Sequence, residues 1–154
     1  MAQHDRISII CSKGSLDMAY PGLVLANAAR MSGIEVMMFF TFWGLDIVNK
    51  EKNEDLHLTL VGNPSVPIPA MIAGLPGMEH LATAMMRKEM QKLDIPPVRE
   101  FITMLSDAGA ELYACQLAMD MFKVKKESLM PEVSAVISAM DFFDKTGTAQ
   151  IIFI

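Results

Sequence analysis

Residues 6–41 read RISIICSKGSLDMAYPGLVLANAARMSGIEVMMFFT, and this stretch decides the fold class. The β-branched run at 6–12 and the apolar run at 34–41 each have the length of a buried strand. Between them, Ser15 is a favourable N-cap residue for a helix, and Gly33 is a typical residue at a helix C-terminus. A strand, a helix and a second strand in so short a stretch predict a βαβ unit with a right-handed crossover.

Pro21 makes the start of this helix ambiguous. A proline in the helix interior removes one backbone hydrogen bond and crowds the preceding turn. The sequence therefore leaves the start open between Ser15 and the neighbourhood of Tyr20, and we expect the helix to run to about Ser32.

The rest of the chain continues the alternation of strands and helices. We expect helices at 78–93, 98–108, 116–122 and 131–144, and strands at 110–114 and 148–154. Such alternation is typical of helices packed on both faces of a sheet whose strands are mostly parallel. The sequence therefore predicts an α/β fold, a three-layer α/β/α sandwich with a mostly parallel sheet of about five strands.

We interpret residues 1–154 as one domain with a Pro/Gly- and Met-rich insertion at about 49–93. The stretch 58–78 carries no charged residue, yet its four prolines are incompatible with a continuous membrane-spanning helix. Methionine suits adaptable apolar surfaces, and the chain has 15 of them. Segment 58–90 is thus a candidate lid, docking surface or membrane contact, and the sequence does not decide among these.

The charge balance argues against nucleic-acid binding. The formal net charge is −5, and the short basic run at Lys123, Lys125 and Lys126 is typical of a solvated helix end. Two cysteines are too few for a disulfide framework, and the first residues show no signal-peptide pattern. These features predict a protein of the reducing cytoplasm.

Candidate functional residues follow three of the expected strands. Cys11 and Lys13 end the first strand, Trp43 follows the second, and Cys115 and Gln116 follow the strand at 110–114. Ligands of open α/β sheets bind at the carboxyl ends of parallel strands. We therefore expect both cysteines to lie on the same edge of the sheet.

Cys115 stands where a strand gives way to a helix. Unpaired N–H groups and the helix dipole favour the thiolate at such a position, and the thiolate is the reactive form. Lys13 is the one obvious cation expected near this edge. The alternative is that Cys115 is an inert buried side chain, as free cysteines often are. Cys11 completes an apolar strand, where a small hydrophobic residue is expected.

Other chemistries find little support in the sequence. His4, His57 and His80 have no cysteine or carboxylate at metal-ligand spacing, so we expect no metal site. No nucleotide-binding or hydrolase motif occurs, and we expect no cofactor. The KGS tripeptide at 13–15 could hold a phosphate at a helix N-terminus, but one glycine is a weak signal.

The chain resembles the DsrE/DsrF-like family of sulfur-relay proteins, in the branch often labelled peroxiredoxin-like. Three segments carry the resemblance: FFTFWGLD (39–46), LPGMEHLATAMMRKEM (75–90) and YACQLAMDMF (113–122). The resemblance implies an α/β/α domain that forms homo-oligomers and carries sulfane sulfur as a persulfide on Cys115. It also implies a small sulfur-carrier protein or a rhodanese as donor or acceptor. The sequence contains no peroxidatic motif that would support the peroxiredoxin-like label.

Lys123 departs from the family pattern, because relatives usually have glycine at that position. The departure puts the end of the short helix in doubt. Two other hypotheses stay open beside sulfur transfer. One is a non-catalytic binding module whose rim and Met-rich insertion hold an apolar ligand or a partner protein. The other is a redox switch in which Cys11 and Cys115 form a disulfide.

Overall fold

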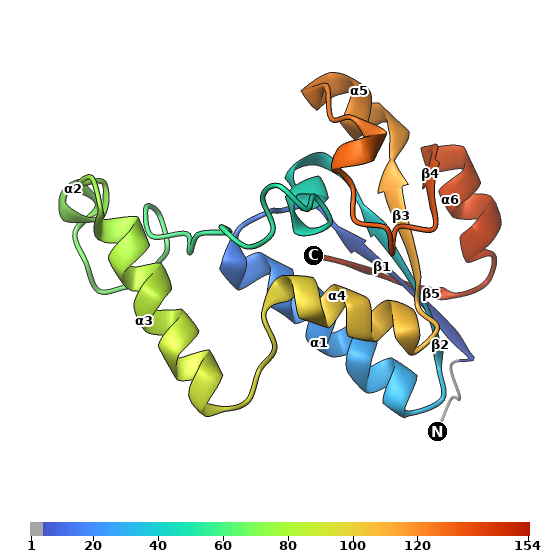
Figure 1. Cartoon of the computed structure of the whole chain (residues 1–154), viewed down its shortest axis with the longest axis horizontal. Coiled ribbons are helices and arrows are strands. Elements are labelled where there is room, and N and C mark those ends of the chain that lie inside the picture. The colour runs from blue at the N-terminus through green and yellow to red at the C-terminus, as the bar shows by residue number, and fades with distance from the viewer. Residues whose placement is uncertain (1–4) are drawn as a thin grey trace.

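A five-stranded sheet with the order β4-β3-β2-β1-β5 forms the centre of the molecule (Figure 1). The computed structural model describes residues 5–154. Its strands are β1 (Arg6–Cys11), β2 (Glu35–Phe40), β3 (Glu111–Cys115), β4 (Ala135–Ile137) and β5 (Gln150–Phe153). Each neighbouring pair is parallel. The α/β fold class and the five-stranded sheet are thus as the sequence predicts.

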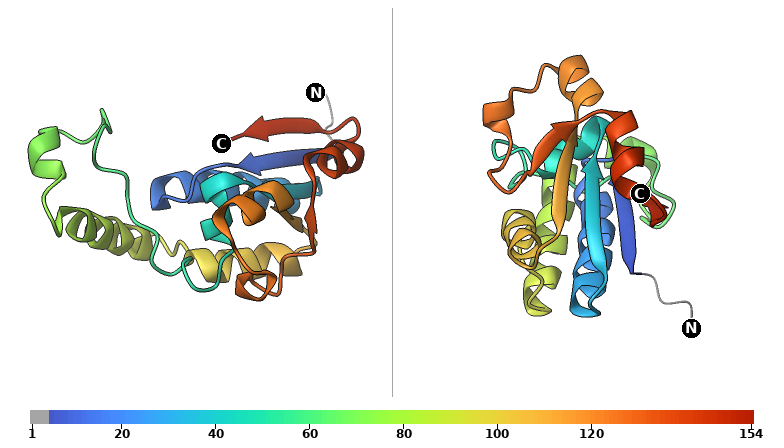
Figure 2. Two further views of the ribbon diagram at one scale, coloured as in Figure 1. Left: turned by 90° about the horizontal axis from the view of Figure 1, so that it is seen from above. Right: turned by 90° about the vertical axis from the view of Figure 1, so that its right-hand side faces the viewer.

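Helices cover both faces of this sheet. They are α1 (Leu16–Met31), α2 (Ala70–Ala73), α3 (Met78–Lys92), α4 (Val98–Asp107), α5 (Gln116–Phe122) and α6 (Ala139–Thr146), with 3-10 helices η1 (Phe42–Ile47) and η2 (Lys126–Ser128). Tyr20 of α1 packs edge-on against Phe101 of α4, with ring centroids 6.3 Å apart. Phe142 of α6 stacks on Phe39 of β2 at 4.9 Å. In the right-hand view of Figure 2, α6 lies in front of the strands and α1 behind them.

The central strands are apolar on both faces because helices cover both. Ile9, Met38, Phe40 and Leu112 are completely buried. Parallel strands of this kind read as continuous hydrophobic runs rather than as alternating ones. The IEVMMFF and ELYA runs of the sequence have this property, and they form β2 and β3.

The helix predicted at 131–144 is wrong in its first half. Residues 135–137 form β4, which pairs with β3, and α6 begins only at Ala139. Ser138 caps α6 through a capping box with Asp141. Apolar residues at helical spacing occur in 133–140, so this short run satisfied the helical pattern although part of it pairs as a strand.

The start of the first helix, which the sequence leaves open, is at the earlier of the two positions. Ser15 is the N-cap, α1 begins at Leu16, and Pro21 lies inside it. The proline costs one backbone hydrogen bond. Packing outweighs that loss, because Leu16, Ala19, Leu23 and other residues on the same side of α1 are buried against the sheet.

Residues 58–95, here called the arm, carry α2 and α3 away from the body of the molecule (Figure 1). Leu58, Leu60 and Ala73 form a small apolar core of their own within it. The buried hydroxyl of Thr83 on α3 accepts a hydrogen bond from the Leu58 backbone N–H at 2.9 Å. Within residues 5–154, no helix is long and apolar enough to cross a membrane.

Candidate functional site at the carboxyl edge of the sheet

Both cysteines lie at the carboxyl edge of the sheet, as the sequence predicts. Cys11 is the last residue of β1, and Cys115 is the last residue of β3 and the N-cap of α5. Between them β2 ends at Phe40 and continues into η1. The edge is therefore built from three strand ends and from the η1 and α5 segments that follow them.

The two thiols point to opposite faces of the sheet. Cys11 is in register with Phe40, and Phe40 with Ala114, so these three side chains share one face. Cys115 is one residue further along β3 and therefore faces the other side. The two strands have β2 between them, so their backbones are about 9–10 Å apart, beyond the reach of a disulfide. Both thiols are free. The proposed redox switch would need the backbone to move.

Cys11 behaves as a core side chain. It is 1% exposed, and its sulfur lies against Gly22 of α1. Burial raises the pKa of this thiol to about 12. A thiol with so high a pKa is protonated at neutral pH and is a poor nucleophile. The structure supports the sequence interpretation of Cys11 as a small hydrophobic residue.

Cys115 occupies a different environment. It is paired with Ile137, and the next residue, Ser138, is the N-cap of α6. The first turns of both α5 and α6 therefore start beside Cys115. Its side chain makes no capping hydrogen bond to α5, and the residue is only 5% exposed. The thiol thus has no fixed hydrogen-bond partner in the helix that it caps.

An exposed aromatic cluster joins the two segments that follow the strands. Trp43 of η1 lies 5.5 Å from Phe122 of α5 between ring centroids, and Phe42 lies 6.0 Å from Trp43 and 6.3 Å from Phe122. Trp43 is 61% exposed, so it lines the edge rather than the core. Phe42 has a φ of 48°, a left-handed conformation that is strained for a bulky residue. Backbone strain of this kind is concentrated at functional sites.

Within residues 5–154, neither polar residue predicted near Cys115 makes a hydrogen bond to its sulfur. Gln116 donates a hydrogen bond from Nε2 to Oδ1 of Asp120 at 2.8 Å on the same helix. Lys13 is exposed and makes no ion pair with any residue in the range 5–154. A supporting role for either residue at the thiol stays a prediction.

Sequence reasoning missed a cavity of about 470 Å³ beside the aromatic cluster. Trp43 and Phe122 line it together with Lys52, Lys123 and Lys125. The basic run was correctly interpreted as a helix end, because Lys123 is the C-cap of α5 and Lys125 and Lys126 are exposed. Its position next to Trp43 could not be read from the sequence, since 80 residues separate them along the chain.

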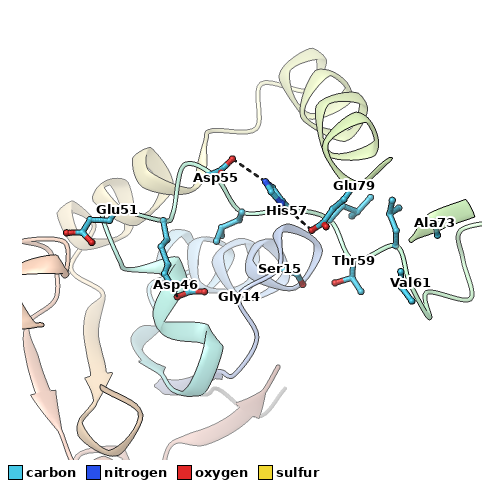
Figure 3. A pocket seen from close by; sticks show the side chains of 14 residues that line it. Gly14, Ser15, Asp46, Glu51, Asp55, His57, Thr59, Val61, Ala73 and Glu79 are labelled. Carbon is cyan, nitrogen blue, oxygen red and sulfur yellow. Dashed lines mark hydrogen bonds and ion pairs between the residues drawn. The ribbon is translucent and has the colours of Figure 1, made fainter. Parts of the chain in front are cut away.

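A second cavity, also of about 470 Å³, lies where the arm leaves the body (Figure 3). His57 lines it, between Asp55 and Glu79, and His80 packs edge-on to His57. His4 lies outside the described residues. Within residues 5–154 no group of three His, Cys, Asp or Glu side chains could hold a metal ion.

The KGS tripeptide at 13–15 shows no sign of a phosphate site. The backbone N–H of Leu16 donates to the carbonyl of His57 at 2.8 Å, and the N–H groups of Met18 and Ala19 donate to the carbonyl of Ser15. The N-terminal groups of α1 are therefore largely occupied by the chain itself. Gly14 is required for another reason: a Cβ there would lie 2.3 Å from the Trp43 carbonyl oxygen.

The five-stranded parallel sheet with helices on both faces defines the chain as an α/β domain of the layered, parallel-sheet class. Residues 3–154 match the DsrE/DsrF/DrsH-like family, and the chain belongs to that family.

Two relatives were found by sequence. The chain is 34% identical over 157 residues to the sulfur carrier protein DsrE2 of Allochromatium vinosum, a match that covers 97% of each chain. It is 26% identical over 136 residues to the uncharacterized protein YrkE of Bacillus subtilis, with 85% of each chain covered.

Solved structures show the same fold at much lower identity. MTH1491 of Methanobacterium thermoautotrophicum, a protein of unknown function, has a TM-score of 0.60 at 9% identity and covers 97% of this chain and 98% of its own. The ychN protein of E. coli has a TM-score of 0.57 at 11% identity, with 97% and 99% covered. These two likenesses concern the fold alone.

Proposed function

We propose that this chain carries sulfane sulfur as a persulfide on Cys115 and passes it to a thiol of another protein. The observation that carries the proposal is the place of Cys115, the last residue of a parallel strand at the edge where ligands of such sheets bind. The relative at 34% identity, a sulfur carrier protein, supports the same activity. Cys11 is unsuited to the role because burial keeps its thiol protonated.

The chemistry needs only one good thiolate. The thiolate of Cys115 attacks the outer sulfur of a donor persulfide R–S–SH, a new S–S bond forms, and the donor leaves as the thiolate R–S⁻. The terminal sulfur keeps its proton, so Cys115–S–SH is the product. In the second step an acceptor thiolate attacks the outer sulfur, and Cys115 leaves as a thiolate. No external oxidant or reductant is consumed.

The surroundings of Cys115 suit a carrier. Its low exposure shields a bound persulfide from bulk thiols, which exchange sulfur readily where they have access. The exposed cluster of Phe42, Trp43 and Phe122 provides an apolar surface on which a partner protein can dock. We expect the donor or acceptor to be a small sulfur-carrier protein or a rhodanese, and the chain to form homo-oligomers.

The test is direct loading with a persulfide. The protein is incubated with the hydropersulfide of a small thiol, desalted, and analysed by intact-mass and peptide mass spectrometry. The wild type should gain the mass of one sulfur atom on the peptide that contains Cys115. Cys11→Ser is the matched control and should load like the wild type. Equal loading of Cys115→Ser and the wild type would contradict the proposal.

One observation favours a second candidate, a non-catalytic binding module. An open cavity of about 640 Å³ lies between α1 and α3 and is lined almost entirely by apolar side chains. They include Tyr20, Val24, Leu25, Met86 and Met90. If this is the functional site, an apolar fluorescent probe should bind with the same affinity before and after alkylation of Cys115, and Leu25→Glu should abolish the binding.

A further inference from the structure

The helix α1 carries apolar side chains on two of its faces. One face is buried against the sheet and includes Ala19 and Leu23. The other carries Tyr20, Val24 and Leu25, which line the open cavity of about 640 Å³ between α1 and α3. Val24 is 49% exposed and Leu25 is 43% exposed. Because a helix on the surface of a domain normally needs only one apolar stripe, the packing of this chain leaves the second stripe without a partner.

The helix α3 supplies the opposite wall of this cavity. Met86 and Met90 stand one turn apart on α3, and both line the cavity. Methionine side chains adapt to the shape of an apolar ligand. Asp17 is the one charged residue among the described residues of the lining, and its carboxylate accepts a hydrogen bond from the Thr59 N–H at 3.0 Å. The cavity therefore suits an apolar chain.

A smaller cavity of about 310 Å³ adjoins the apolar one. Leu16, Tyr20 and Met90 line both of them. Each volume lies in the range of about 300–1,000 Å³ that is typical of small-molecule sites. The smaller cavity adds two guanidinium groups, those of Arg87 on α3 and Arg99 on α4. A ligand that occupies both cavities would thus have one end among apolar side chains and the other beside cations.

The charges of the smaller cavity leave one cation without a counter-charge. Glu54 is the one carboxylate in its described lining, and it pairs with Arg99 at 3.0 Å. Arg87 is half-buried and makes no ion pair within residues 5–154. Its Nη2 donates to the carbonyls of Glu54 and Leu56 at 2.8 and 3.1 Å. A guanidinium has five N–H donors, so those on Nε and Nη1 remain available to an anion.

We propose that the two cavities together bind a single-chain anionic amphiphile of the fatty-acid type, with its carboxylate at Arg87 and its apolar chain between α1 and α3. A guanidinium binds a carboxylate through two parallel N–H···O bonds. The chain of the ligand covers the apolar side chains that α1 and α3 leave exposed to water. Cys115 lines neither cavity. The proposal therefore goes beyond sulfur transfer and does not rest on it.

Isothermal titration calorimetry with dodecanoate tests the proposal. At about pH 7.5 the carboxylate of this probe is ionised, and its concentration is kept below that at which micelles form. The wild type should bind one dodecanoate per chain. Dodecyltrimethylammonium has the same chain with a positive head, and acetate has the head without the chain. Both should bind at least tenfold more weakly than dodecanoate.

Two pairs of variants make the test specific. Arg87→Gln should weaken dodecanoate binding about ten- to a hundredfold, because it removes a charge-assisted hydrogen-bond donor. Lys88→Gln loses the same charge at an exposed position outside both cavities and should bind like the wild type. Val24→Asp should abolish the binding, whereas Ala28→Asp, one turn further along α1, should not. All four variants should load sulfur on Cys115 like the wild type, so the result is independent of the sulfur-transfer proposal.

Methyl NMR locates the bound chain. The methyl signals of Met86 and Met90 should shift when dodecanoate is added, and that of Met140 on α6, which is 79% exposed, should not. The proposal is overturned if dodecanoate does not bind, if dodecyltrimethylammonium binds as tightly, or if Arg87→Gln binds dodecanoate as tightly as the wild type. Shifts at Met140 without shifts at the two α3 methionines would overturn it as well.

Discussion

Replacing Gly22 by alanine places a methyl group 2.9 Å from the sulfur of Cys11. Real Cβ atoms do not approach sulfur so closely, so something must move. The sulfur has little freedom to do so, because Cys11 is 1% exposed and Met38 and Ile154 also border the new methyl group at 3.6 Å. The loss in the free energy of unfolding caused by Gly22→Ala therefore measures how firmly Cys11 is packed.

The magnitude follows from two opposing terms. Alanine is more favourable than glycine inside a helix by about 1 kcal/mol. Overpacking a filled core costs about 1–3 kcal/mol. In the wild type we expect Gly22→Ala to lower the free energy of unfolding by about 1 kcal/mol. In a Cys11→Ala background the sulfur is gone, and the same substitution should raise the free energy of unfolding by about 1 kcal/mol.

The double-mutant cycle consists of the wild type, Gly22→Ala, Cys11→Ala and the double variant. Urea unfolding followed by far-UV circular dichroism measures the free energy of unfolding of each. The coupling should be about 2 kcal/mol, within the range found for residues in direct contact. Persulfide loading of Cys115 serves as the functional control and should be unchanged by Cys11→Ala. If Gly22→Ala has the same effect in both backgrounds, Cys11 does not fill the space that we assign to it.

Three further outcomes are expected from urea unfolding. Gly44→Ala should cost about 3 kcal/mol or more, because its Cβ would lie 2.0 Å from the Cys11 carbonyl oxygen; a smaller loss would mean that η1 can shift. Between about pH 8.5 and pH 12 the unfolded chain loses the Cys11 proton while the folded protein keeps it, so stability should fall by up to about 1.4 kcal/mol per pH unit. Cys11→Ala should lack this component, whereas Cys115→Ser should retain it. Lys123→Gly should raise stability by about 1 kcal/mol by removing left-handed strain at φ 54°; no gain would show that the lysine side chain compensates for the strain.

Most of the sheet could be predicted because its strands are long apolar runs with clear stop signals. The exception is β4, whose three residues, 135–137, lie inside a run with helical spacing. The Ser138-x-x-Asp141 pattern is the sequence signature of the capping box that starts α6 at this point. Pro21 left the start of α1 open, because the local penalty of a proline can be read from the sequence whereas the burial of one side of the helix cannot.

The candidate site was predictable in its position and not in its surroundings. Strand-to-helix junctions in the sequence placed Cys11 and Cys115 on one edge, and the parallel sheet confirms that placement. Which face each thiol takes depends on register between strands that are distant in sequence, and no local pattern encodes it. The contact between Trp43 and Phe122 has the same origin, since it arises from the packing of η1 against α5.

The Lys123 departure from the family pattern has a simple structural outcome. The helix α5 still ends at Phe122, and Lys123 takes the left-handed conformation that a glycine would adopt more easily. A lysine at position 123 is therefore compatible with the same helix end.

The place of β5 in the strand order has a consequence for synthesis on the ribosome. β1 is translated first among the strands, and one of its two edges is paired only with β5, which is translated last. That edge stays open until residues 150–153 have emerged, and unpaired strand edges invite association between nascent chains. The protein should therefore depend on holding chaperones during translation more than a domain whose sheet closes early.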